Sequence, residues 1–186
     1  MEVNKPSLGL ITPHGGYREL KSYQSAEIVY DATVRFCDRF VDRKSRTHDQ
    51  MVQAARSGKQ NIAEGSQASG TSRKTELKLV GVARASLEEL LLDYQDFLRQ
   101  RGLALWDKGH PRAQAVRKLA YMTYKNLVES DPETAANTLL CLMHQTNYLP
   151  DQQLRQLEQQ FVQEGGFTER PYQVRRQVRR ARDRIQ

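Results

Sequence analysis

The C-terminal residues 170–186 carry the side chains best suited to binding an anion. This segment holds seven arginines against Asp183 alone, whereas residues 1–169 hold 22 Lys and Arg against 21 Asp and Glu. Six of the seven net positive charges therefore belong to the tail, and the rest of the chain is nearly neutral at +1. Every basic residue in it is arginine, whose planar guanidinium binds phosphate oxygens in pairs. The tail residues predicted to contact nucleic-acid phosphates are Arg175, Arg176, Arg179, Arg180, Arg182 and Arg184.

The same tail has a narrow apolar stripe, so more than one kind of binding partner is possible for it. The stripe consists of Val174, Val178, Ala181 and Ile185. A basic amphipathic helix of this kind binds nucleic acid, docks on its own or a neighbouring subunit, or lies on an anionic membrane. The stripe lacks aromatic residues, which argues against the membrane. We favour nucleic acid and keep docking between subunits or onto a protein partner as the alternative.

A second possible phosphate contact lies near the middle of the chain. Arg73 and Lys74 follow Ser72, which is predicted to cap a helix, and helix N-termini attract anions. An ordinary solvated surface is the competing interpretation. The preceding residues 65–72 imitate a phosphate-binding loop, but position 71 is Thr and not Lys, and a helix precedes the loop where a strand is required. Nucleotide binding is therefore not predicted.

The sequence offers no arrangement of residues for catalysis or for holding a metal or cofactor. Its four histidines, at positions 14, 48, 110 and 144, are dispersed. Cys141 and His144 are one helical turn apart, but Cys141 sits within a Leu-Leu-Cys-Leu-Met run and is expected to be buried. No Ser-His-Asp pattern is present. We expect a protein that is not an enzyme and needs no cofactor.

Hydrophobic periodicity predicts an all-α fold, because apolar residues recur three and four positions apart and no strand-like alternation is present. Caps are expected at Thr47 with Gln50, at Ser72 and at Asp131, and Gly102 is expected to end a helix. Pro150 is expected to bend the last long helix. The predicted helices cover residues 22–43, 47–65, 73–101, 111–128 and 132–165. The predicted organisation is an N-terminal arm (1–21), a helical bundle (22–150) and a helical suffix with the Arg-rich tail (151–186).

The composition limits the size of the hydrophobic core and indicates the cellular compartment in which the protein is expected. Apolar residues make up 38% of 186, so the core is thin and another copy of the chain is expected to complete it. No segment approaches the length of a membrane span, and the first residues do not resemble a signal peptide. Cys37 and Cys141 lie in apolar helical patterns, typical of buried thiols in a reducing compartment. We expect a cytoplasmic protein that does not enter a membrane.

Two motifs in the middle of the chain resemble a known bacterial family. Residues 54–65 fit A-x-x-S-x-x-x-N-I-A-E-G, and residues 83–90 fit A-x-G-S-L-x-E-L with Ala85 in place of the commoner glycine. This is similar to the four-helix-bundle family first named from intervening sequences in bacterial large-subunit ribosomal RNA. The likeness spans about residues 22–150. Gly-Gly-Tyr-Arg at 15–18 and Gly-Gly-Phe-Thr-Glu at 165–169 resemble the branch with a C-terminal suffix.

The resemblance implies an antiparallel four-helix bundle that assembles into a ring, by analogy a pentamer, without known catalysis. One relative, the accessory variability determinant of diversity-generating retroelements, is a basic pentamer that binds nucleic acid and a reverse transcriptase. The partners that this likeness implies are further copies of the chain, RNA or DNA, and a reverse transcriptase or another protein. Fold alone does not fix function.

Considered physically, the shared motif is structural. Ile62 and Ala63 fit a helix interface, and Asn61 and Glu64 are expected to bond polar groups of a neighbouring helix. Arg84 is the expected ion partner of Glu64, and an acid/base pair is the less favoured alternative. The residues of this structural motif are Asn61, Glu64, Gly65, Arg84, Ser86 and Glu88.

The sequence leaves two hypotheses for the function of the protein. The first is a non-enzymatic, oligomeric nucleic-acid-binding or adaptor protein whose tail contacts phosphates without sequence specificity. The second is a scaffold whose tail joins subunits or docks on a protein partner.

Overall fold

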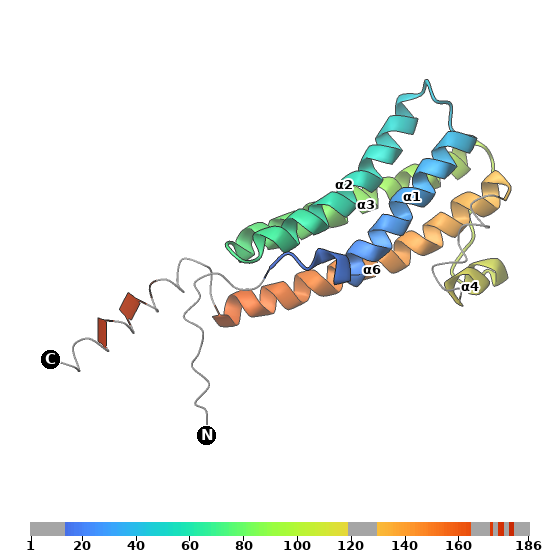
Figure 1. The fold of residues 1–186 in the computed structure, drawn as a ribbon. Coiled ribbons are helices and arrows are strands. Elements are labelled where there is room, and N and C mark those ends of the chain that lie inside the picture. The colour runs from blue at the N-terminus through green and yellow to red at the C-terminus, as the bar shows by residue number, and fades with distance from the viewer. Residues whose placement is uncertain (1–13, 119–129, 165–171, 173–174, 177–178, 181–186) are drawn as a thin grey trace.

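The computed structural model describes residues 14–118, 130–164, 172, 175–176 and 179–180 (Figure 1). Over these residues it is helical and contains no strand, which confirms the predicted fold class. The predicted helical residues 119–128, the stripe residues 174, 178, 181 and 185 and the first part of the N-terminal arm lie outside this description. The elements are the short η1 (Tyr17–Glu19), α1 (Lys21–Phe40), α2 (Arg46–Ala68), α3 (Arg73–Gln100), α4 (Pro111–Lys118) and α6 (Pro132–Glu164).

Three of the predicted helix ends are confirmed, two by side-chain capping bonds and one by its backbone conformation. The Ser72 hydroxyl accepts from the amide of Thr75 at 3.2 Å, and the Asp131 carboxylate accepts from the amide of Thr134 at 2.9 Å. Those bonds satisfy amides that have no partner inside their own helices. Gly102 follows α3 with φ of +62°, a left-handed conformation in which a side chain would be strained.

The two ends of α2 differ from the prediction. Ser45 is the N-cap, its hydroxyl accepting from the amide of Thr47 at 3.2 Å, so the capping box expected at Thr47 is wrong. At the other end the helix continues through Gly65 to Ala68. Gly65 is buried against α3, and this packing holds it in the helix although glycine has little intrinsic preference for one.

Four long helices surround the main core. Contacts join α1 to α2, α2 to α3, α3 to α6 and α6 back to α1, and α4 packs on α6 (Figure 1). Phe36 lies at the centre, with its ring edge-on to those of Tyr94 and Phe97 at centroid distances of 4.9 and 4.8 Å. The hydroxyl of the fully buried Tyr94 donates to Thr33 at 3.1 Å. A second, smaller cluster consists of Ala26, Ile62 and Ala83, so Ile62 fulfils its predicted place in an interface.

A close helix contact lies between α2 and α3. Gly58 is buried, and a methyl group added there would lie 2.7 Å from Cγ of the fully buried Leu87. Gly81 on α3 differs, because a methyl group added there would meet nothing within 4 Å. The two glycines therefore have opposite roles: Gly58 allows the helices to approach, whereas the space beside Gly81 is open within one chain.

The last described helix crosses the expected boundary between bundle and suffix. α6 runs from Pro132 to Glu164 with Pro150 inside it and buried, so we find no end of a helix at residue 150. The segment after Pro150 still packs on the bundle. Gln153 accepts from the Ser22 hydroxyl at 3.0 Å, and Leu157 is 8% exposed. These contacts after the proline, with the buried residues of α6 before it, offset the loss of the backbone hydrogen bond that proline cannot donate.

The described part of the N-terminal arm packs against the end of α2. The amide of Gly15 donates to the carbonyl of Ser66 at 3.2 Å, and Gly15 has φ of +86°. His14 lies so close to Gly70 that a methyl group on Gly70 would be 2.5 Å from the imidazole Nδ1. The arm therefore covers the turn between α2 and α3. Among the described helices none is both long and apolar enough to cross a membrane.

Candidate functional site

The described arginines of the tail are exposed to solvent. Arg175, Arg176, Arg179 and Arg180 are helical and exposed, as is Tyr172 at 67%. The four guanidinium groups and the phenol are therefore accessible to a binding partner. Arg182 and Arg184, the other two predicted contacts, lie outside the described residues.

The second predicted phosphate contact lies at the N-terminus of α3. Arg73 is half-buried and Lys74 is exposed. Burial raises the pKa of Glu76, one turn into the helix, and the positive charge of Arg73 opposes that rise. Arg73 and Glu76 therefore lie close enough for their charges to interact. The Ser72 hydroxyl already accepts one of the first amides of the helix.

The shared motif does not form the predicted pair between α2 and α3. Asn61 donates to the carbonyl of Ser57 in its own helix at 2.9 Å, and Glu64 is exposed. Arg84 binds Glu88 at 2.8 Å and Asp151 at 3.0 Å. The expected ion pair between Glu64 and Arg84 is therefore wrong. The physical reason is the direction of Arg84, which reaches from α3 to α6, the helix on its other side.

Arg84 and Glu88 belong to a series of polar contacts that we call the α6 seam. Glu88 also accepts from Asn147 at 3.3 Å. Further along, the hydroxyls of Ser25 and Thr146 share a buried hydrogen bond of 2.6 Å. The seam joins α1 and α3 to α6 through polar bonds whose directions restrict how α6 slides or rotates. Its members are Ser22, Ser25, Arg84, Glu88, Thr146, Asn147, Asp151 and Gln153.

We expect Arg84→Met to lower the free energy of unfolding by about 1–2 kcal/mol, a value discounted because the Arg84 side chain is 31% exposed. The substitution leaves Glu88 and Asp151 without their shared cation. The matched control is Arg99→Met on the same helix. Arg99 pairs with Asp96 at 2.8 Å, but its side chain is 69% exposed, so we expect a loss below about 0.5 kcal/mol. Urea unfolding measures both, and equal losses would contradict a structural role for the seam.

Gly65 and Ser86 have different surroundings. A methyl group on Gly65 would lie 3.5 Å from the Glu76 carbonyl oxygen and from Val80, so a small residue suits this contact between α2 and α3. Ser86 is half-buried and lines a surface hollow of about 390 Å³ between the same helices, together with Ser57 and Glu89. These residues shape the packing and the surface of the α2–α3 pair.

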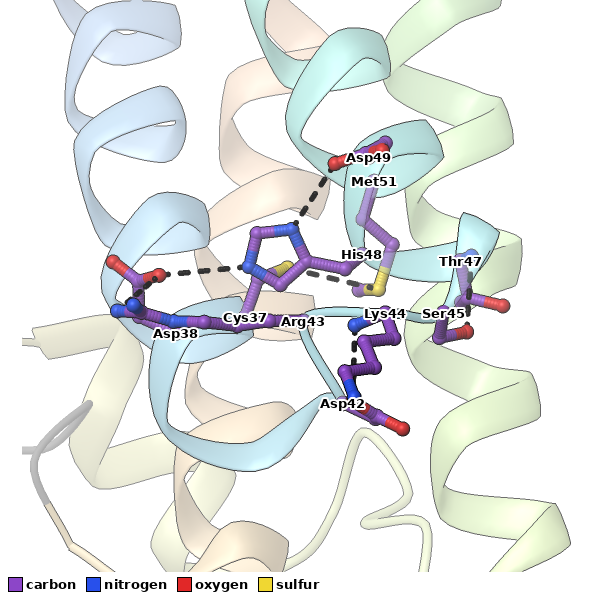
Figure 2. Close-up of polar contacts among 10 residues, drawn as sticks. All are labelled: Cys37, Asp38, Asp42, Arg43, Lys44, Ser45, Thr47, His48, Asp49 and Met51. Carbon is purple, nitrogen blue, oxygen red and sulfur yellow. Dashed lines mark hydrogen bonds and ion pairs between the residues drawn. The ribbon is translucent and has the colours of Figure 1, made fainter.

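Sequence reasoning missed the surroundings of His48 at the corner between α1 and α2. Figure 2 shows its imidazole between two carboxylates, with Nε2 3.5 Å from Asp38 and Nδ1 3.5 Å from Asp49. Asp38 also pairs with Arg43 at 3.1 Å. Asp38 lies ten residues before His48 and Asp49 directly follows it. Neither spacing is a pattern that predicts such a site from the sequence. Over the described parts of the chain, no group of three His, Cys, Asp or Glu side chains is placed to hold a metal.

Both cysteines are buried and free, as the apolar patterns around them predict. Burial raises the pKa of Cys37 to about 12, and its thiol contacts the Met51 sulfur at 3.9 Å (Figure 2). Burial also raises the pKa of Cys141, opposed by the charge of Arg117. At neutral pH both remain thiols, which are poor nucleophiles.

Comparisons with known proteins add no assignment to these sites. Searches with protein-family models, curated proteins and solved structures each give no match to the chain. The functional inference therefore depends on the residues and contacts described above.

Proposed function

We propose that the protein is a non-enzymatic, oligomeric nucleic-acid-binding or adaptor protein whose Arg-rich tail contacts phosphates. The observation that carries the proposal is the segregation of charge. Seven arginines stand against one acid in residues 170–186, and the four that are described are exposed and helical. Such a cationic face binds the phosphate backbone of RNA or DNA without reading its sequence.

The proposed architecture is an antiparallel four-helix bundle of α1, α2, α3 and α6, as the resemblance to the ribosomal-RNA intervening-sequence family implies. The closed cycle of contacts among these helices and the short turns before α2 and α3 support it. Assembly into a ring, by analogy a pentamer in the cytoplasm, is part of the same proposal. In a ring, several tails act on one nucleic acid and their affinities multiply.

A scaffold that docks on a protein, a reverse transcriptase or another, is the second candidate. It is favoured by the large apolar side chains exposed towards the C-terminus. Val162 is 78% exposed, Tyr172 67% and Phe161 37%. Side chains of this type at an accessible surface are common at protein interfaces.

The test compares the full chain with a truncation after residue 169, which retains every helix from α1 to α6. Fluorescent single- and double-stranded RNA and DNA are titrated at low salt, and light scattering gives the mass of both proteins. We expect binding by the full chain, loss of most of it on truncation, and an unchanged number of subunits.

The outcomes separate the two candidates. No binding by the full chain at low salt would overturn the nucleic-acid proposal. A truncated chain that falls apart into smaller species would assign the tail to assembly, as the scaffold requires.

A further inference from the structure

A hollow of about 450 Å³ lies where the loop after α3, the helix α4 and the middle of α6 meet. Leu105 and Trp106 from the loop and Leu140 and Cys141 from α6 provide its apolar lining. The volume is in the range of pockets that hold small organic molecules. No proposed role of the tail or of the α6 seam uses this site.

The aromatic wall of the hollow is held in place before any ligand arrives. The Trp106 amide donates to Asn137 at 2.8 Å, and its indole N–H donates to Glu133 at 3.4 Å. The indole also stacks on His110, with ring centroids 5.1 Å apart and an angle of 10° between the planes. Asn137 is 1% exposed and donates to the carbonyl of Ala104 at 2.8 Å. A wall fixed in this way loses little freedom when a flat molecule lies on it.

The charged side chains that line the hollow are cationic. Arg117 and Lys108 belong to the lining, and no acidic residue does among the described residues. Arg117 donates to the carbonyl of Lys108 at 2.8 Å, which ties α4 to the loop. The charge of Arg117 reaches Cys141 on the wall, because it opposes the rise that burial causes in the pKa of that thiol. The nearby carboxylate of Glu133 is already bonded to Trp106 and to the amide of Ala104 at 3.2 Å.

We infer that this hollow is a binding site for a small organic anion with a flat apolar body, such as an aromatic carboxylate or sulfonate. The indole and the leucines contact the apolar body of the ligand, and the side chains of Arg117 and Lys108 bind its anionic group. Charge-assisted hydrogen bonds to a guanidinium are strong where the surroundings are partly buried. The inference stands independently of nucleic-acid binding.

The test uses two fluorescent probes that differ in one anionic group. 8-Anilinonaphthalene-1-sulfonate carries the sulfonate, and N-phenyl-1-naphthylamine is its uncharged counterpart. Trp106 is the single tryptophan of the chain, so quenching of its emission with energy transfer to the probe reports binding near it. We expect saturable binding of the sulfonate by the intact, folded full-length protein, with about one probe per chain.

Neighbouring positions on α4 supply matched variants. Arg117→Gln is expected to weaken binding of the sulfonate about tenfold, the effect of one charge-assisted hydrogen bond, and to leave the uncharged probe nearly unchanged. Lys118→Gln removes the same charge from an exposed residue outside the lining and is expected to change neither. Lys108→Gln, at an exposed loop position, gives a second test if Arg117→Gln loosens the loop.

Three results would overturn the inference. They are an absence of saturable sulfonate binding, equal losses for Arg117→Gln and Lys118→Gln, and sulfonate binding that neither Arg117→Gln nor Lys108→Gln weakens. Circular dichroism of each variant checks that the helices remain.

Discussion

Binding of nucleic acid by the full chain is expected to weaken several hundredfold when the salt concentration rises from about 50 to about 200 mM. Six tail arginines that each neutralise one phosphate release condensed counterions, so the logarithm of affinity falls against the logarithm of salt with a slope of about −4 to −5 per tail. Fluorescence anisotropy at four or more salt concentrations measures this slope. A slope near zero would contradict phosphate binding by the tail.

The slope also locates the contacts. Replacing Arg175 and Arg176 together by Gln removes two of the six charges and is expected to make the slope less steep by about 1.5 to 2. The control is Arg35→Gln, an exposed arginine on α1 that lies outside the tail and is expected to leave the slope unchanged. Equal changes in both proteins would show that general surface charge, and not the tail, attracts the nucleic acid.

Gly58→Leu is expected to lower the free energy of unfolding by about 3 kcal/mol or more, because overpacking a filled core forces side chains and backbone apart. Even a methyl group at this position would lie 2.7 Å from the fully buried side chain of Leu87. The gain in helix propensity from replacing glycine, about 0.8–1 kcal/mol, is too small to offset this cost. Urea unfolding measures the loss, with the two proteins fitted to the same dependence of the unfolding free energy on urea concentration.

Gly81→Leu is the matched control on the facing helix. A Cβ there meets nothing within 4 Å in the single chain, so the gain in helix propensity is expected to stabilise it slightly. Losses of similar size at both positions would contradict the close α2–α3 contact at Gly58. A loss of oligomers by Gly81→Leu alone, without unfolding, would place Gly81 at a contact between copies of the chain.

The structure gives Arg84 of the shared motif ion partners different from the one that its sequence favours. Asn61 and Glu64 make no bond to a neighbouring helix among the contacts described, and Arg84 instead joins α3 to α6 through Asp151. Residues 84 and 151 are far apart along the chain, and their pairing depends on which side of α3 the helix α6 occupies. The sequence marks Arg84 as a residue expected to form an ion pair, but it does not show which carboxylate supplies the partner.

The helical class, most helix ends and the location of the positive charge follow from local sequence patterns. Helical periodicity, the caps at Ser72 and Asp131 and the stop at Gly102 are local properties, because each involves residues within about one turn of one another. The charge of the tail is equally plain, since it requires only a count of residues.

Contacts between segments remote in the chain became known only from the tertiary structure. It places Gly15 against Ser66, His48 beside Asp38, and Trp106, Arg117 and Cys141 around one hollow. It also shows that α6, which the sequence predicts to bend at Pro150 and continue to about residue 165, is one helix across that proline. Local preference opposes a proline inside a helix, and burial on both sides of it outweighs that preference. Such outcomes depend on how whole helices pack together, and a short stretch of sequence does not contain that information.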